Sequence, residues 1–168
     1  DAAPPELADD YRNQLTELEA TLGGLANVGL ELTDNHSIGL FGLYTHVGED
    51  ATSHVTGFRD SSDANIDRTR LQFVERELRF AQLLGKHRFP DQGGLELRWQ
   101  GNAATTRRDE LDSRDIAYEL DDDGSRFFIN QPGSAQRFFS LLDDTSLGLG
   151  ADALVPSGPI RIKTGLSA

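Results

Sequence analysis

The 168-residue chain has no cysteine, which excludes a disulfide framework, a thiolate nucleophile and a cysteine-ligated metal. It also has no stretch of 18 consecutive apolar residues, so no transmembrane helix is predicted. Basic residues are scarce, because 16 Lys and Arg stand against 28 Asp and Glu and give a formal net charge of −12. Nucleic acid is therefore not an expected partner, since phosphate binding needs a basic surface.

A hydrophobic period of two is the clearest pattern in the chain. Between Thr16 and Leu32 almost every even-numbered residue is apolar, and most odd-numbered ones are polar or small. Side chains alternate between the two sides of a strand, so this run predicts a strand with one apolar face. Its length is about three times that of a usual strand. The apolar positions are Leu18, Ala20, Leu22, Gly24, Ala26, Val28, Leu30 and Leu32.

Alternation recurs along residues 16–168 and predicts an all-β fold, a long antiparallel up-and-down meander of about six strands. Residues 1–15 are the exception, because helical spacing within Pro4–Gln14 allows a short helix where a polar loop is the other reading. The further strands are expected near 37–45, 68–89, 95–103, 145–155 and 160–167.

The predicted connections differ in length. Short turns are expected near 33–35, 90–94 and 156–159, whereas long polar loops are expected near 50–67 and 104–136. Outer-membrane barrels have this asymmetry between their two rims. A hairpin of the third and fourth long strands predicts one polar wall, made of Glu75, Glu77, Arg79, Glu96 and Arg98.

Several stretches together, spanning roughly residues 20–168, resemble the barrel region of TonB-dependent outer-membrane receptors. The order and spacing of a Glu-Arg pair, a Gly-x-His and a Trp carry the resemblance, since no catalytic signature is involved. The stretches are Leu25–Leu32, Phe73–Leu78, Gln82–Phe89, Leu95–Trp99, Arg108–Glu119 and Arg137–Pro156.

The resemblance implies a large antiparallel barrel occluded by a plug domain, in the outer membrane of a Gram-negative bacterium. It implies uptake of a scarce solute of the siderophore–iron, cobalamin or oligosaccharide class, recognised through extracellular loops. The implied partners are that small molecule, outer-membrane lipid and, through the plug, the TonB complex. Neither enzymatic chemistry nor a cofactor is expected.

We expect the whole of 1–168 to be a segment of such a barrel. Six strands are fewer than the eight of the smallest membrane barrels. No plug domain precedes them, and the last residues, Gly165–Ala168, lack a terminal aromatic. The alternative is a soluble β-sandwich that binds, for example, carbohydrate. It accounts for the alternation but not for the long strands. A β-rich enzyme is a third reading that has no candidate active site.

Two pairs of acidic residues come closest to a catalytic dyad. Glu75 and Glu77 share a strand face but have arginines beside them, whereas Asp143 and Asp144 point to opposite faces. A solvated wall is therefore favoured over acid–base catalysis. Ser53 and Ser140 have no His and Asp partners at a recognisable spacing, so no nucleophilic site is predicted.

The acidic loop Asp121–Ser125 is the best metal candidate, because clustered carboxylates suit Ca²⁺. The twelfth position counted from Asp121 is Pro132 and not the Glu of an EF-hand, so a solvated loop is favoured. Asp60, Asp63 and Asp67 have the same interpretation. The histidines show no zinc spacing, and each is read as a turn, interface or loop residue: His36, His46, His54 and His87.

Aromatic residues fall at two kinds of position. Trp99 and Tyr44 suit either an aromatic girdle at a membrane interface or the core of a soluble sandwich, and the sequence does not separate these. Four phenylalanines flank the turn at Gln131–Ser134 and are expected to pack together: Phe127, Phe128, Phe138 and Phe139.

Overall fold

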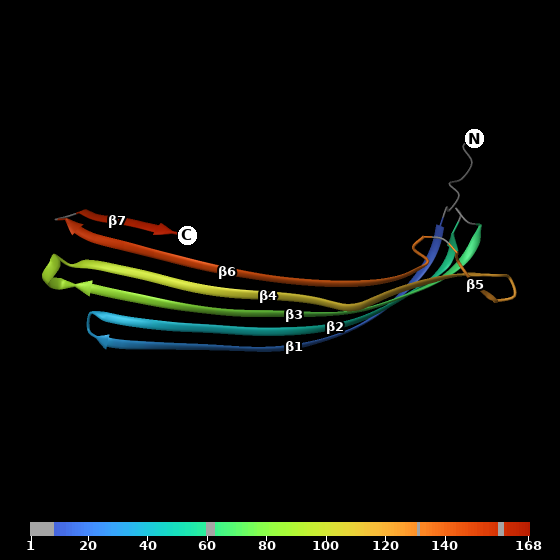
Figure 1. Cartoon of the computed structure of the whole chain (residues 1–168), viewed down its shortest axis with the longest axis horizontal. Coiled ribbons are helices and arrows are strands. Elements are labelled where there is room, and N and C mark those ends of the chain that lie inside the picture. The colour runs from blue at the N-terminus through green and yellow to red at the C-terminus, as the bar shows by residue number, and fades with distance from the viewer. Residues whose placement is uncertain (1–8, 60–62, 131, 158–159) are drawn as a thin grey trace, which may run out of the picture. The chain divides into compact units, whose positions relative to one another are not determined.

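Nearly every residue that the computed structural model describes lies in a β-strand (Figure 1). The described residues are 9–59, 63–130, 132–157 and 160–168. Five strands are 23 to 26 residues long, far beyond the usual five or six. The elements are β1 (Asp9–Thr33), β2 (His36–Arg59), β3 (Ala64–Phe89), the 3₁₀ turn η2 (Pro90–Gln92), β4 (Leu95–Leu120), β5 (Arg126–Phe128), β6 (Ala135–Ser157) and β7 (Ile160–Ser167).

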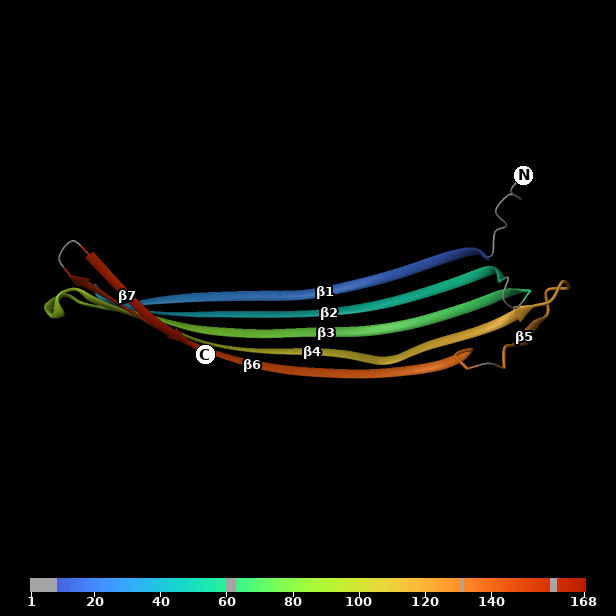
Figure 2. The same cartoon turned by 90° about the horizontal axis from the view of Figure 1, so that it is seen from above.

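The strands form one open antiparallel sheet in the order β1-β2-β3-β4-β6-β7, with the short β5 on the end of β4. Tyr118 of β4 pairs with Phe128 of β5, and Ala151 of β6 pairs with Leu166 of β7. Figure 1 shows β7 beside β6, and Figure 2 shows β5 at the end of β4. The predicted all-β up-and-down meander is therefore confirmed.

The helix allowed by the spacing within Pro4–Gln14 is wrong for the part of that segment that is described. β1 begins at Asp9 and runs without interruption to Thr33. The helical spacing and the alternating run overlap at Leu15 and Leu18. Cross-strand contact decides for the strand, because Ser53 of β2 donates a 2.9 Å hydrogen bond to the side-chain oxygen of Asn13. Residues 1–8 lie outside the described residues.

The two long loops were predicted too long. β2 and β3 continue through 50–59 and 64–67, and β4 continues to Leu120, so the described loop after β4 begins only at Asp121. These segments are polar, but their polar groups meet across strands. Arg68, for example, donates a 2.7 Å bond to Asp115. Cross-strand charge pairs stabilise strands that composition alone assigns to loops.

The predicted short turns at 33–35 and 90–94 are confirmed. Asp34 and Asn35 join β1 to β2, and the Asn35 amide donates to the Thr33 hydroxyl at 3.2 Å. After η2 the chain turns through Gly93 and Gly94 at φ of 72° and 81°, a left-handed conformation that favours glycine. The third turn includes 158–159, which lie outside the described residues.

The chain divides into two units, each made of pieces from several strands. We call Thr21–His46, Arg76–Arg107 and Leu142–Ala168 the turn unit, since it holds the short turns. Asp1–Ala20, Val47–Glu75 and Arg108–Leu141 form the loop unit. Buried apolar side chains are few, and among the described residues they all lie in the loop unit: Ile66, Val74, Ala117 and Ile129.

Trp99 packs closely against Gly85 in the turn unit. A Cβ built on Gly85 would lie 2.1 Å from Cε2 of the indole, so only glycine leaves room for the ring. The ring also stacks on His87, with an angle of 20° between the planes. An aromatic side chain lying over a strand glycine supplies the contacts that the glycine lacks.

We predict that Gly85→Ala displaces the Trp99 ring and lowers the free energy of unfolding by about 1–3 kcal/mol, the usual cost of overpacking. Trp99 is the only tryptophan, so its emission should shift to the red in the variant, as measured with the denaturant midpoint in detergent micelles. The control is Gly42→Ala, whose Cβ would have no atom within 4 Å. Equal effects of the two substitutions would contradict this account.

Candidate functional site

Side-chain contacts in the turn unit show which residues share a face of the sheet. The Tyr44 hydroxyl donates to Glu77 at 3.3 Å, and Nδ1 of His36 lies 3.1 Å from Nδ1 of His87. Trp99 Nε1 donates to His87 at 3.0 Å. Even-numbered residues of β2 therefore share one face with odd-numbered residues of β3 and β4.

The same face continues across β6 and β7. Arg107 of β4 lies 4.0 Å from Asp143 of β6, and Ala151 pairs directly with Leu166. We call the part of this face that runs from the short turns to the first Asp, Glu, Lys or Arg on each strand the uncharged face. It consists of even-numbered 36–44 of β2, odd-numbered 81–89 of β3, odd-numbered 95–105 of β4, odd-numbered 145–155 of β6 and even-numbered 160–166 of β7.

The uncharged face has a limited height along the strands. Charged side chains resume at Arg79 on β3, Arg107 on β4 and Asp143 on β6. The intervening runs match the 9–11 strand residues that cross a bilayer. Its leucines are open to the surroundings: Leu147 is 77% exposed and Leu149 is 69% exposed. A large apolar surface of this kind marks an interaction site.

The opposite face of the turn unit holds an apolar contact between Phe41 and Phe80, but toward the turn it carries charged and polar side chains, and we call that part the polar wall. Glu96 lies among three basic groups: Arg98 Nε at 2.6 Å, Arg88 at 3.5 Å and Lys86 at 4.0 Å. Further along the face, Gln100 and Asn102 of β4 lie against glycines of β6, and Lys163 of β7 lies 3.2 Å from Asp152 of β6.

The prediction that Glu77, Arg79, Glu96 and Arg98 share one face is wrong in part. Glu77 and Arg79 lie on the face that holds Tyr44, whereas Glu96 and Arg98 lie on the opposite face. The turn after β3 places odd-numbered residues of β3 beside odd-numbered residues of β4, and even-numbered beside even-numbered. Glu96 therefore contacts Arg88. The charges of β3 change sides between Arg79 and Lys86, and alternation over the whole strand hides this change.

A groove of about 1370 Å³ lies in the turn unit. Its lining brings the polar wall together with polar groups of β1 and β2, and it carries both signs of charge. The lining includes Glu31, Ser37, Lys86, Arg98, Gln100 and Asp152. These side chains can hydrogen-bond a polar solute but offer no nucleophile paired with a base.

Buried carboxylates in the loop unit are each hydrogen-bonded. Asp115, 8% exposed, accepts from Arg68, and Glu110, 3% exposed, accepts from Gln72 at 2.8 Å and from Arg108 at 2.9 Å. Buried charges are tolerated when they are paired in this way. These groups stabilise the strands and are not disposed for catalysis.

Within the loop unit, charged groups hold the segment after β4 against β3 and β4. Arg126 of β5 lies 2.7 Å from the buried Asp67, which also accepts from His54 at 2.7 Å. Arg137 at the start of β6 donates to Asp112 at 2.7 and 3.0 Å. Asp67, predicted as part of a solvated acidic loop, is thus a buried strand residue. Residues 60–62 lie outside the described residues.

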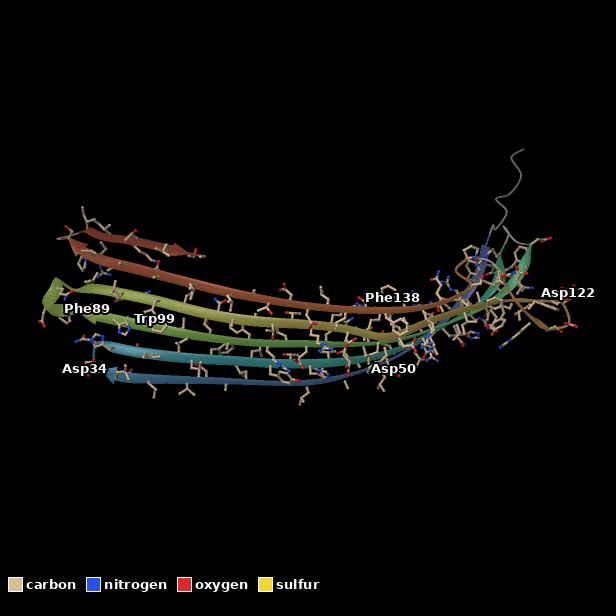
Figure 3. The ribbon with its side chains drawn as sticks, in the orientation of Figure 1. Asp34, Asp50, Phe89, Trp99, Asp122 and Phe138 are labelled. Atoms are coloured by element: carbon tan, nitrogen blue, oxygen red, sulfur yellow. The ribbon has the colours of Figure 1, made fainter. Side chains whose placement is uncertain are left out.

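The Asp121–Ser125 loop is exposed, and its carboxylates hydrogen-bond to its own backbone. Asp121 accepts from the Asp122 amide at 2.9 Å, and Asp123 accepts from the Ser125 amide at 2.8 Å. Hydrogen bonds from Ser125 lower the pKa of Asp123 below its usual value. These are turn-forming contacts typical of Asp. Figure 3 shows Asp122 at the tip of this loop.

One acidic group was not foreseen in the sequence. Glu17 and Glu19 of β1 and Glu49 of β2 bring their carboxylate oxygens within 4.8 Å of one another. The two glutamates of β1 are exposed, and acidic side chains often gather on exposed strands without an ion. Only the i, i+2 spacing of Glu17 and Glu19 was visible in the sequence.

The remaining candidates have ordinary partners. Glu77 contacts Tyr44, Arg79 and His46, and Asp143 contacts Arg107, so neither predicted carboxylate pair stands as an isolated dyad. The packing predicted for the phenylalanines is wrong, because all four are more than half exposed: Phe127, Phe128, Phe138 and Phe139. Phe128 instead contacts the Tyr118 ring, and Arg137 lies over the Phe139 ring.

A scan against protein-family models gave no match for this chain, and no curated protein matches it significantly. Among the described residues, no helix has the length and hydropathy needed to cross a membrane.

We predict that Arg68→Ala lowers the free energy of unfolding by about 1–3 kcal/mol, because the buried Asp115 carboxylate loses its charged donor. Denaturant unfolding measures the change. Arg70→Ala removes an exposed arginine two residues along the same strand and should cost less than about 0.5 kcal/mol. The ion-pair account fails if both variants unfold at the same denaturant concentration.

Proposed function

We propose that this chain forms part of the wall of an outer-membrane receptor barrel of the TonB-dependent type, acting in uptake of a scarce solute. The observation that carries the proposal is the uncharged face. It crosses five strands, is bounded by charges at one level, and lies opposite a polar wall. Barrels that span a membrane have an outward apolar band and a polar interior.

The dimensions of the uncharged face support a bilayer as its environment. The apolar band of an outer-membrane barrel is about 25 Å tall, which tilted strand segments of about 9–11 residues provide. The odd-numbered positions of 81–89, 95–105 and 145–155 form runs of that size on one face, and none of them is Asp, Glu, Lys or Arg. The polar wall, with Glu96 and Arg98, would then line the lumen.

The aromatic residues of this face fit the same assignment. Tyr44 lies at one limit of the face, where Glu77 and Arg79 begin, and Phe89 and His36 lie at the other limit beside the short turns. Amphipathic rings gather at the two levels where lipid meets water. A soluble sandwich needs a second layer on such a face, whereas Leu147 and Leu149 remain exposed.

Solute recognition would fall to the loop unit, and within it to the segment after β4. That segment carries exposed acids and phenylalanines and is fastened to the sheet by Arg126 and Arg137. The family resemblance assigns energy input to a plug domain that contacts the TonB complex. This chain would make and break no covalent bond, so its chemistry would be binding alone.

Trp99 gives a direct test, because it lies on the uncharged face and is the only tryptophan. We predict that lipids with brominated acyl chains strongly quench its emission when the chain is reconstituted into vesicles. In the matched variant Trp99→Phe with Gln100→Trp, the indole moves to the polar wall and quenching should fall severalfold.

Two outcomes would overturn the proposal. One is equal quenching of the indole at positions 99 and 100, since lipid would then contact both faces. The other is a chain that folds cooperatively as a monomer in buffer without lipid or detergent. That result would favour the soluble binding module.

A further inference from the structure

Three side chains at the turn end of the uncharged face contact one another in sequence. Trp99 Nε1 donates to His87 Nε2 at 3.0 Å, and His87 Nδ1 lies 3.1 Å from His36 Nδ1. The chain of contacts links β4, β3 and β2. Figure 3 shows Trp99 and Phe89 at this end of the turn unit, where Asp34 marks the β1–β2 turn.

The contacts determine where the imidazole protons are. An indole nitrogen only donates, so His87 must accept at Nε2 and carry its proton on Nδ1. His87 Nδ1 is then the donor to His36, which accepts at Nδ1 and carries its own proton on Nε2. Both rings are neutral and have opposite tautomers. The hydrogen bonds are therefore donated in one direction, from Trp99 to His87 and from His87 to His36.

Adding one proton to either ring breaks this order. A proton on His87 Nε2 would face the indole N–H, and a proton on His36 Nδ1 would face the N–H of His87. In each case two donors oppose each other and at least one hydrogen bond is lost. Imidazole is the side chain that ordinarily changes charge between pH 5 and 8.

The charged groups around the two imidazoles are few and lie off their face. Asp34 and Asp91 are in the adjoining turns. Lys86 and Arg88 flank His87 but point to the polar wall, where both lie near Glu96, and Glu31 of β1 lines the groove on that side. On β2, β3 and β4 the face itself carries no acidic or basic side chain between Tyr44 and the turns, apart from the two histidines.

We propose that Trp99, His87 and His36 form a pH-sensitive clasp at the turn ends of β2, β3 and β4. The clasp is closed while both imidazoles are neutral and opens when either one is protonated. Gly85 is part of the device, because it leaves the space in which the indole ring lies flat against its neighbours. The clasp depends on the strand pairing alone and not on lipid, solute or a TonB partner.

The tautomers are the first test and need no substitution. In the ¹⁵N-labelled full chain in detergent micelles at pH 8, long-range ¹H–¹⁵N NMR should find the His87 proton on Nδ1 and the His36 proton on Nε2. The emission of Trp99 should then shift to the red in one transition as the pH falls from about 8 to 5.

Variants separate the clasp from a general effect of acid. His87→Gln keeps an acceptor for the indole N–H that does not titrate, so Trp99 should give its pH 8 emission throughout. His87→Phe removes the acceptor and should give the red-shifted emission already at pH 8. His54→Gln, at the histidine that binds Asp67 in the loop unit, should keep the unmodified transition.

Three results would overturn the clasp. The first is the same tautomer at His36 and His87, and the second is an acid transition of Trp99 that survives in His87→Gln. The third is a response of Trp99 to added Zn²⁺ at pH 8 that His36→Phe abolishes, which would make the imidazoles metal ligands. All measurements on the clasp are made in micelles. They can therefore succeed or fail independently of the quenching experiment in vesicles, which tests the proposed function.

Discussion

The register between β3 and β4 is the constraint on which the two faces of the turn unit depend. The turn through η2, Gly93 and Gly94 places odd-numbered residues of the two strands side by side, as the contact of Trp99 with His87 shows. A slip of one residue would exchange every side chain of one strand between the faces. Glu96 would then lie on the uncharged face, away from Arg88 and Lys86. The separation of charge from apolar surface therefore rests on turn geometry as much as on composition.

That constraint also explains how strands so long stay paired in two different surroundings. In the turn unit the pairing brings apolar residues together on one side, whereas in the loop unit it brings acids to bases, as with Asp115 and Arg68. Desolvated carboxylates such as Glu110 need several donors each, and the neighbouring strands supply them. Polar pairing thus extends the strands well beyond the height of the uncharged face.

Alternation along the sequence was enough to predict the fold class, the meander and the turns at 33–35 and 90–94. It failed where polar residues pair across strands, because local composition gives no sign that Arg68 will meet Asp115. It failed again on β3, where Arg79 lies on one face of the sheet and Lys86 on the other. Alternation assigns residues to two faces but does not say that the charged residues move from one face to the other along the strand. The contact of His36 with His87 joins residues 51 apart and could be foreseen only with the β2–β3 register in hand.

The two edges of the sheet carry backbone groups that need hydrogen-bond partners. β7 pairs with only the last part of β6, from Gly150 to Ser157, and β1 is the first strand of the order. In lipid each backbone N–H and C=O must be paired, because no water replaces a missing partner. A sheet with an uncharged face at bilayer height is therefore consistent with the proposed function only when further strands cover both edges. Under the proposed function, a curved and closed sheet would turn Glu96, Arg98 and Lys163 toward water inside and leave Leu147 and Leu149 to lipid.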